Sequence, residues 1–97
     1  MSAAPLPANE SQRLSALLEL GLLDTGPEED YDALAVAVAQ ACDCPIGSVS
    51  LVDATRQWFK AAHGLALSEL PRENSFCAHA ILGSSLFVIA DTLADVR

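Results

Sequence analysis

The chain has 97 residues, of which 52% are hydrophobic, and its 13 acidic against 5 basic residues give a formal net charge of -8. Phosphate contacts need Lys and Arg, so this balance argues against nucleic-acid binding and against anionic membrane surfaces. No apolar run approaches the roughly 20 residues of a membrane span, and the start MSAAPLPANES lacks the pattern of a signal peptide. We therefore expect a cytoplasmic chain of at most one domain, with three reduced cysteines.

The first half of the chain predicts two helices. Residues 1–8 carry two prolines among small residues and are expected to form a flexible leader. Asn9 can cap a first helix, whose leucines recur at helical spacing until Gly21 stops it. Thr25 and Glu28 form a T-x-x-E capping box for a second helix, which runs to about residue 42. Its expected apolar face consists of Tyr31, Leu34, Ala35, Val38 and Cys42. The acidic run 28–30 is expected to be a solvated first turn.

The second half predicts a small sheet. Residues 46–52 and 57–62 are expected to be strands of a hairpin, joined by a turn in which Asp53 and Arg56 can pair. Residues 64–74 are expected to form a loop, and Ser75 caps a short helix that ends at Gly83. Residues 86–90 predict a third strand. This order of elements indicates an α+β fold with helices packed on an antiparallel sheet.

Several linked motifs resemble the amino-terminal GAF domains of bacterial sensor histidine kinases and diguanylate cyclases. The motifs are NESQRL at 9–14, LGLLDT at 20–25, SLVD at 50–53, RQWFK at 56–60, SFCAHAI at 75–81 and DTLADVR at 91–97. They cover residues 9–97, which we expect to form a partial GAF-like (PAS-like) domain. The chain is shorter than the usual members of this family, so the resemblance implies a domain that is incomplete on its C-terminal side.

The resemblance also implies a function. It predicts a sensory or relay module for signal transduction inside a longer bacterial protein, with an output signalling domain elsewhere and no enzymatic activity. Because the mean hydropathy of +0.32 is high for so acidic a chain, apolar surface is expected to meet a partner, and we predict a homodimer. The alternative is a dimerisation or interaction module that works without any ligand.

The stretch NSFCAHAI raises several chemical possibilities. Cys77 and His79 could form the nucleophile and base of a thiol redox enzyme, since some GAF-fold proteins use cysteine redox chemistry, but on a helix residues i and i+2 point about 200° apart. A zinc set would need further ligands, and the candidates are Cys42, Cys44, Cys77 and His79. Their C-x-C and C-x-H spacings are tighter than usual zinc spacings. A bilin tether is a further alternative, because phytochrome-like GAF domains use a cysteine beside a histidine, but here Ala78 intervenes.

We predict instead that this stretch forms the wall of a sensor pocket, with no catalytic residue, metal or cofactor. Backbone N–H groups at residues 75–77 could receive an anionic group, with Arg72 close by in sequence. One of the aromatic residues Trp58 and Phe59 would face the pocket, because neighbours on a strand point to opposite faces. The predicted ligand-binding residues are Trp58, Arg72, Ser75, Phe76, Cys77 and His79.

Overall fold

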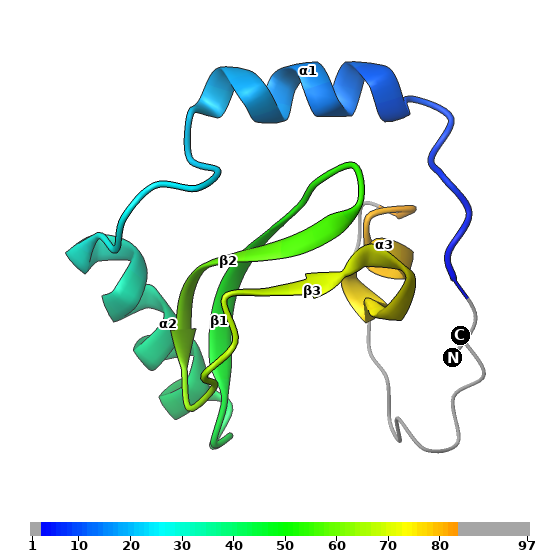
Figure 1. The fold of residues 1–97 in the computed structure, drawn as a ribbon. Coiled ribbons are helices and arrows are strands. Elements are labelled where there is room, and N and C mark those ends of the chain that lie inside the picture. The colour runs from blue at the N-terminus through cyan, green and yellow to red at the C-terminus, as the bar shows by residue number, and fades with distance from the viewer. Residues whose placement is uncertain (1–2, 84–97) are drawn as a thin grey trace.

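A computed structural model describes residues 3–83 of the chain (Figure 1). Its elements are α1 (Glu10–Leu20), α2 (Glu29–Ala41), β1 (Gly47–Val52), β2 (Arg56–His63), β3 (Glu69–Pro71), a 3₁₀ turn η1 (Arg72–Asn74) and α3 (Phe76–Ala80). The three strands form one antiparallel sheet in the order β1-β2-β3. The prediction of an α+β fold with an antiparallel sheet is therefore confirmed.

The helices lie on different sides of this sheet. α2 packs against β1 and β2, while α1 crosses above the hairpin and α3 lies near the far end of β3 (Figure 1). The buried apolar residues are few and mostly small: Leu17, Ala35, Ala39, Val52, Trp58, Ala61 and Ala78. With so small an apolar core, polar contacts between the elements have a large share in fixing their arrangement.

The first helix begins and ends close to its predicted limits. Gly21 adopts a left-handed conformation with φ of 64°, and its N–H bonds to the carbonyl of Leu18, so the predicted stop is confirmed. The side chain of Asn9 makes no capping hydrogen bond. Its backbone carbonyl instead accepts the N–H of Arg13 at 2.9 Å. The prediction of side-chain capping by Asn9 was therefore wrong.

The prediction that Thr25 caps α2 was also wrong. The helix begins at Glu29, after an extended Glu28 whose side chain makes no capping bond. The Thr25 hydroxyl donates to the Leu22 carbonyl at 2.5 Å and accepts from the Lys60 ammonium at 2.6 Å. The buried ammonium needs oxygen partners, and this hydroxyl is one of them.

α2 meets the sheet through the small residues Ala35 and Ala39. Of the predicted apolar face, Ala35 is buried as expected, whereas Leu34, Val38 and Cys42 are exposed. A Cβ on Gly47 would come within 2.2 Å of the Ala35 carbonyl oxygen. Helix and strand therefore approach so closely that only alanine and glycine fit between them, which turns the larger side chains away.

The hairpin contains one irregularity, at Lys60. Val49 pairs with Ala61 and Ser50 pairs with Phe59, so Lys60 is an extra residue on β2. This β-bulge interrupts the alternation of the strand, and Lys60 and Ala61 are buried in succession. The predicted turn that follows β1 is confirmed, since the Asp53 N–H bonds to the Arg56 carbonyl at 2.7 Å.

The predicted loop at 64–74 contains regular structure. Residues of β3 pair with Arg56, Gln57 and Trp58 of β2, and η1 follows directly. Three residues carry too little periodicity to predict a strand, because its pairing with β2 is a tertiary contact. The third strand expected at 86–90 lies outside the described residues.

We predict that Gly47→Ala destabilises the chain by about 2 kcal/mol or more, since the new methyl group would meet backbone atoms, which cannot rotate away. The measurement is the free energy of unfolding from urea denaturation. Gly26→Ala is the matched control, because no atom lies within 4 Å of a Cβ at Gly26. Equal stability of the two variants would contradict the close approach of α2 and β1.

Candidate functional site

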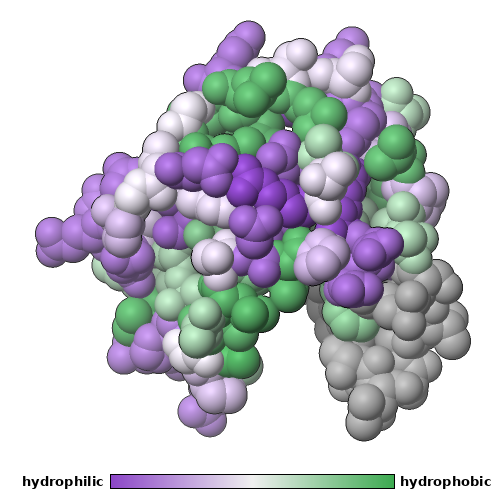
Figure 2. Space-filling model, viewed as in Figure 1, coloured by the Kyte–Doolittle hydropathy of each residue, from purple (hydrophilic) through white to green (hydrophobic). Residues whose placement is uncertain are grey.

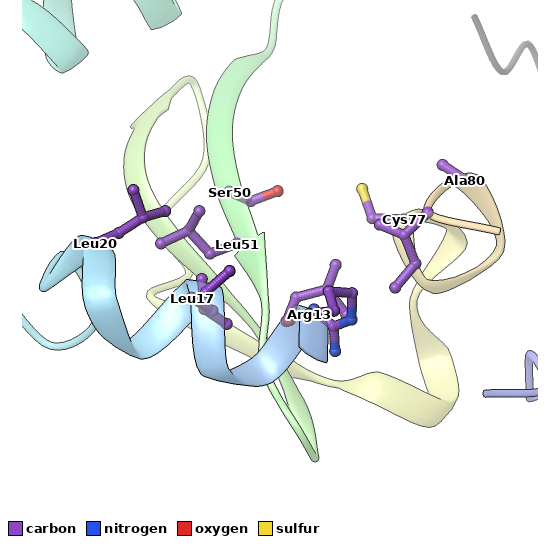
Figure 3. A pocket seen from close by; sticks show the side chains of 10 residues that line it. Arg13, Leu17, Leu20, Ser50, Leu51, Cys77 and Ala80 are labelled. Carbon is purple, nitrogen blue, oxygen red and sulfur yellow. Dashed lines mark hydrogen bonds between the residues drawn. The ribbon is translucent and has the colours of Figure 1, made fainter. Parts of the chain in front are cut away.

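The candidate site is an apolar groove between α1, β1 and α3, with a cavity volume of about 520 Å³ (Figure 3). We call it the α1 groove. Its lining consists of Arg13, Ala16, Leu17 and Leu20 from α1, Ser50, Leu51 and Val52 from β1, and Cys77, Ala80 and Ile81 from α3 and the residue after it. Its volume is within the usual range of small-molecule sites.

One carboxylate holds α1 beside this groove. Glu10, at the start of α1, accepts hydrogen bonds from Arg13 Nε at 2.8 Å and Nη2 at 3.0 Å. It also pairs with the Arg72 guanidinium, with 2.5 Å between Oε2 and Nη1. Arg13 is one turn along the same helix, whereas Arg72 follows β3, so the carboxylate joins segments 62 residues apart.

Both guanidinium groups that bind Glu10 also donate hydrogen bonds to backbone carbonyls at the end of the β1–β2 hairpin. Arg13 Nη1 donates to the carbonyl of Val52, and Arg72 Nη1 donates to the carbonyl of Asp53 at 3.0 Å. The start of α1 is therefore attached to the hairpin through Glu10, Arg13 and Arg72, which we call the Glu10 cluster. Arg72 is buried, so this attachment is largely shielded from solvent.

Hydrogen bonds from Arg13 and Arg72 lower the pKa of Glu10 from its ordinary 4.5 to about 2. A carboxyl group whose pKa is lowered by folding contributes its full stabilisation to the folded chain at pH values above the pKa that the group has in the unfolded chain. This contribution is then lost as the pH falls from about 4.5 towards 2. The side chain of Glu10 is only 16% exposed, so solvent screens the cluster less than an open surface pair.

We predict that Glu10→Gln lowers the free energy of unfolding at pH 7 by about 1 to 3 kcal/mol, because two guanidinium groups lose their charged acceptor. The difference between wild type and variant should shrink as the pH falls from 4.5 to about 2. Urea denaturation at several pH values measures it. Glu19→Gln, on the same helix, is the control. A pH-independent difference would contradict the role of the Glu10 charge.

A second cluster fixes Cys77 at the groove. The buried amide of Gln57 donates to Ser50 Oγ at 3.0 Å and to Cys77 Sγ at 3.2 Å, and it accepts from Ser75 Oγ at 2.6 Å. Ser75 Oγ also accepts the N–H of Ala78 at 3.2 Å, which confirms the predicted cap of the short helix. These bonds place a thiol and a hydroxyl in a lining whose other members, apart from Arg13, are apolar (Figure 3).

We predict that Ser75→Ala destabilises the chain by about 1 to 3 kcal/mol, because α3 loses its cap and the Gln57 carbonyl oxygen loses a buried donor. Alkylation of Cys77 by N-ethylmaleimide should also become faster, as α3 loosens. Ser68→Ala is the control, since the Ser68 side chain is exposed. An unchanged stability and alkylation rate would contradict the role of the hydrogen bonds that join Gln57 to Ser50, Ser75 and Cys77.

The structure separates the predicted ligand-binding residues. Cys77 lines the α1 groove, and Ser75 supports it from behind through Gln57. Arg72 lines a different hollow of about 370 Å³, and its guanidinium is bound to Glu10. The remaining three, Trp58, Phe76 and His79, are not among the residues that line the groove. Their assignment as ligand-binding residues stays a prediction.

Four residues that define the site were not among those predicted from the sequence: Arg13, Leu17, Ser50 and Gln57. Leu17 belongs to the leucine pattern of the first helix, so its burial had a local signal. Gln57 and Ser50 are polar residues inside strands, and the role of such residues can be predicted only when their cross-strand partner is known.

Lys60 shows how another cation is used. Its side chain is 1% exposed, and its ammonium contacts Glu28 Oε2 at 2.6 Å and the Gly26 carbonyl at 2.7 Å, in addition to Thr25. The Tyr31 ring centroid lies 5.6 Å from it. The acidic run 28–30 is exposed at the start of α2, as predicted. Glu28 has a further role that was not predicted, because it supplies the counter-charge that the buried ammonium requires.

Arg56 is paired in the same way. It binds Asp24 through two bonds of 2.7 and 2.9 Å, Asp53 at 3.1 Å and Glu69 at 3.4 Å. Its hydrogen bonds lower the pKa of Asp24, and the pKa of Arg56 rises for the same reason. The predicted pairing of Asp53 with Arg56 is confirmed. Each Lys and Arg within residues 3–83 is thus paired with a carboxylate.

The cysteines do not gather in the described part of the chain. Cys42 and Cys44 are exposed at the end of α2, whereas Cys77 is half-buried at the groove. Among residues 3–83, no group of three or more His, Cys, Asp or Glu side chains is arranged to hold a metal ion. In the same residues, no helix has the length and apolar character required to cross a membrane.

No protein-family profile matches the chain. Over all 97 residues, the chain is 39% identical to a Pseudomonas aeruginosa protein named as a cyclic di-GMP phosphodiesterase. The chain spans only 16% of the length of that relative. This likeness is consistent with the expected segment of a bacterial signalling protein, but it does not confirm the resemblance to a GAF domain.

The comparison corrects one expectation. The sequence analysis predicted a protein without enzymatic activity, whereas the similar Pseudomonas aeruginosa protein is named as an enzyme. The motifs within these 97 residues gave no indication of phosphodiesterase chemistry. Because of this relative, the prediction that the protein is not an enzyme is withdrawn.

Proposed function

We propose that the chain is a sensory or relay module of a bacterial cyclic di-GMP signalling protein, and that it binds a small molecule in the α1 groove. The observation that carries this proposal is the groove itself, a hollow lined by α1, β1 and α3 whose side chains are apolar apart from Arg13, the Ser50 hydroxyl and the Cys77 thiol. The relative named as a cyclic di-GMP phosphodiesterase supports the signalling context. On this proposal the longer protein acts on cyclic di-GMP.

The charges around the groove favour an uncharged ligand. Arg13 is the one cation among the lining residues, and three of its hydrogen bonds go to Glu10 and the Val52 carbonyl. Arg72, which the sequence analysis placed beside an anionic group, is likewise bound to Glu10. An anionic ligand would have to break these pairs, at the cost of leaving Glu10 without its counter-charges.

A ligand in this groove would act on the position of α1. The start of the helix is fixed by the Glu10 cluster, but towards its other end Leu17 and Leu20 face the groove. A molecule that contacts both leucines and α3 would favour one angle of α1 over others, provided that it binds the two arrangements with different affinity. Such a shift would be passed to the α1–α2 connection, which Arg56 and Lys60 hold to β2.

The exposed leucines favour a second candidate, an interaction module that forms a homodimer. Leu18 and Leu20 on α1 are 73% and 61% exposed, and Leu34 on α2 is also exposed. Hydrophobic residues gather over α1 and beside α2, separated by a hydrophilic band (Figure 2). A second copy that covers these leucines would remove them from water. The net charge of -8 on each copy would make the two copies repel each other, most strongly at low salt.

We predict that the neutral probe N-phenyl-1-naphthylamine binds the chain, and that its anionic relative 8-anilinonaphthalene-1-sulfonate binds at least about ten times more weakly, a difference of about 1.4 kcal/mol. Fluorescence titration measures both. Ala80→Trp should abolish binding of the neutral probe by filling the groove, whereas Ala37→Trp on the exposed side of α2 should not. The neutral probe should also protect Cys77 from alkylation.

Two results would count against the proposal. Equal binding of both probes would contradict the preference for an uncharged ligand. Unchanged probe binding in Ala80→Trp, together with concentration-dependent dimer formation in sedimentation velocity, would favour the interaction module.

A further inference from the structure

Two exposed thiols at the end of α2 belong to no feature described so far. Cys42 is the C-terminal cap residue of α2, and Cys44 follows it after one residue, Asp43. The position of this C-x-C pair at the junction between α2 and β1 places it on the surface, outside the α1 groove.

The backbone around this pair is held in a defined turn. The N–H of Cys44 bonds to the Ala39 carbonyl at 2.8 Å, and the N–H of Asp43 bonds to the Gln40 carbonyl at 3.1 Å. Asp43 has a φ of 51°, in the left-handed region. These two hydrogen bonds around a left-handed residue form a Schellman motif. The flanking cysteines are therefore held by the end of the helix.

This turn brings the two cysteines to a separation that suits a disulfide. In a Schellman motif the residue after the left-handed one, here Cys44, turns its side chain back towards the helix positions of Val38 and Ala39. Cys42 follows those two positions by four and three residues, so it lies on the same face of the helix, unlike two residues i and i+2 within a regular helix. The Cα atoms on either side of a residue such as Asp43 lie about 5.4 Å apart. Disulfides span Cα separations of about 4.4 to 6.8 Å. The Cys44 thiol already folds back over the preceding turn, since Sγ donates to the Cys42 carbonyl at 3.3 Å.

We propose that Cys42 and Cys44 form a redox-active dithiol that closes to an intramolecular disulfide when it reacts with a small disulfide such as oxidised glutathione. One cysteine thiolate attacks the oxidant, whose S–S bond breaks and releases a first glutathione thiolate. The other cysteine thiolate then attacks the protein sulfur of this mixed disulfide and releases the second glutathione. The two cysteine protons go to the two leaving thiolates, so one S–S bond forms and one breaks.

The third thiol is set apart from this reaction. Cys77 lies in α3, is half-buried, and accepts a hydrogen bond from Gln57 of β2. Closing the Cys42–Cys44 bond would replace the hydrogen bond from Cys44 to the Cys42 carbonyl and fix the junction that leads from α2 into β1. Because the ring is small and exposed, reduction by thiols should reopen it readily.

The test is oxidation of the full chain in glutathione buffers of defined ratio, followed by alkylation and mass spectrometry. As the buffer becomes more oxidising, two alkylatable thiols should disappear together, with a loss of about 2 Da from the protein, one hydrogen from each thiol. After trypsin, the bond should lie in the peptide of residues 14–56, which contains Cys42 and Cys44, while Cys77 in residues 73–97 stays alkylated.

Variants make the test specific. Cys77→Ser should keep the paired loss of thiols, whereas Cys42→Ser and Cys44→Ser should each gain one glutathione and lose the closed form. Both positions are exposed, so folding of these variants, checked by circular dichroism, should be unchanged. The proposal would be overturned by two separate glutathione adducts on the wild type, by a bond to Cys77, or by disulfide-linked dimers on a non-reducing gel.

Discussion

The carboxylate of Glu10 is the contact on which the position of α1 depends. α1 buries a single apolar residue, Leu17, so apolar packing alone contributes about 1.5 to 3 kcal/mol to its attachment. Arg13 and Arg72 converge on Glu10 and reach the backbone at the tip of the hairpin. A helix held at one end by charge and along its length by little apolar surface is suited to move against the sheet.

The other cations in the described part of the chain are paired with carboxylates in the same way. Arg56 and Lys60 neutralise carboxylates of the α1–α2 connection, as Arg13 and Arg72 do at the start of α1. The acids without such partners, including Asp30 on α2, keep the surface negative. A groove whose nearest cation is already paired therefore differs from the anion site that the sequence suggested around Arg72, and this difference supports the proposal of an uncharged ligand.

Local signals were enough to predict much of the fold. Gly21 as a helix stop, Ser75 as a cap and the Asp53–Arg56 turn each depend on neighbouring residues, and each is confirmed. Errors arose where a distant partner decides the outcome. Thr25 is bound to Lys60, and α2 turns its alanines to the sheet because Gly47 allows a close approach. For the site, the NSFCAHAI motif identified Cys77, but nothing local indicated that Gln57 would hold it.

Amide hydrogen–deuterium exchange of the wild type and Glu10→Gln at pH 7 tests the role of Glu10 most directly. We predict that exchange in α1 rises much more than exchange in α2, β1 and β2, because these elements lose only the global stability that the variant gives up, whereas α1 also opens locally without the Glu10 cluster. An equal rise across helix and sheet would contradict this role, since it would mean that Glu10 stabilises the fold as a whole and not the position of one helix. Unchanged exchange in α1 would show that other contacts hold it.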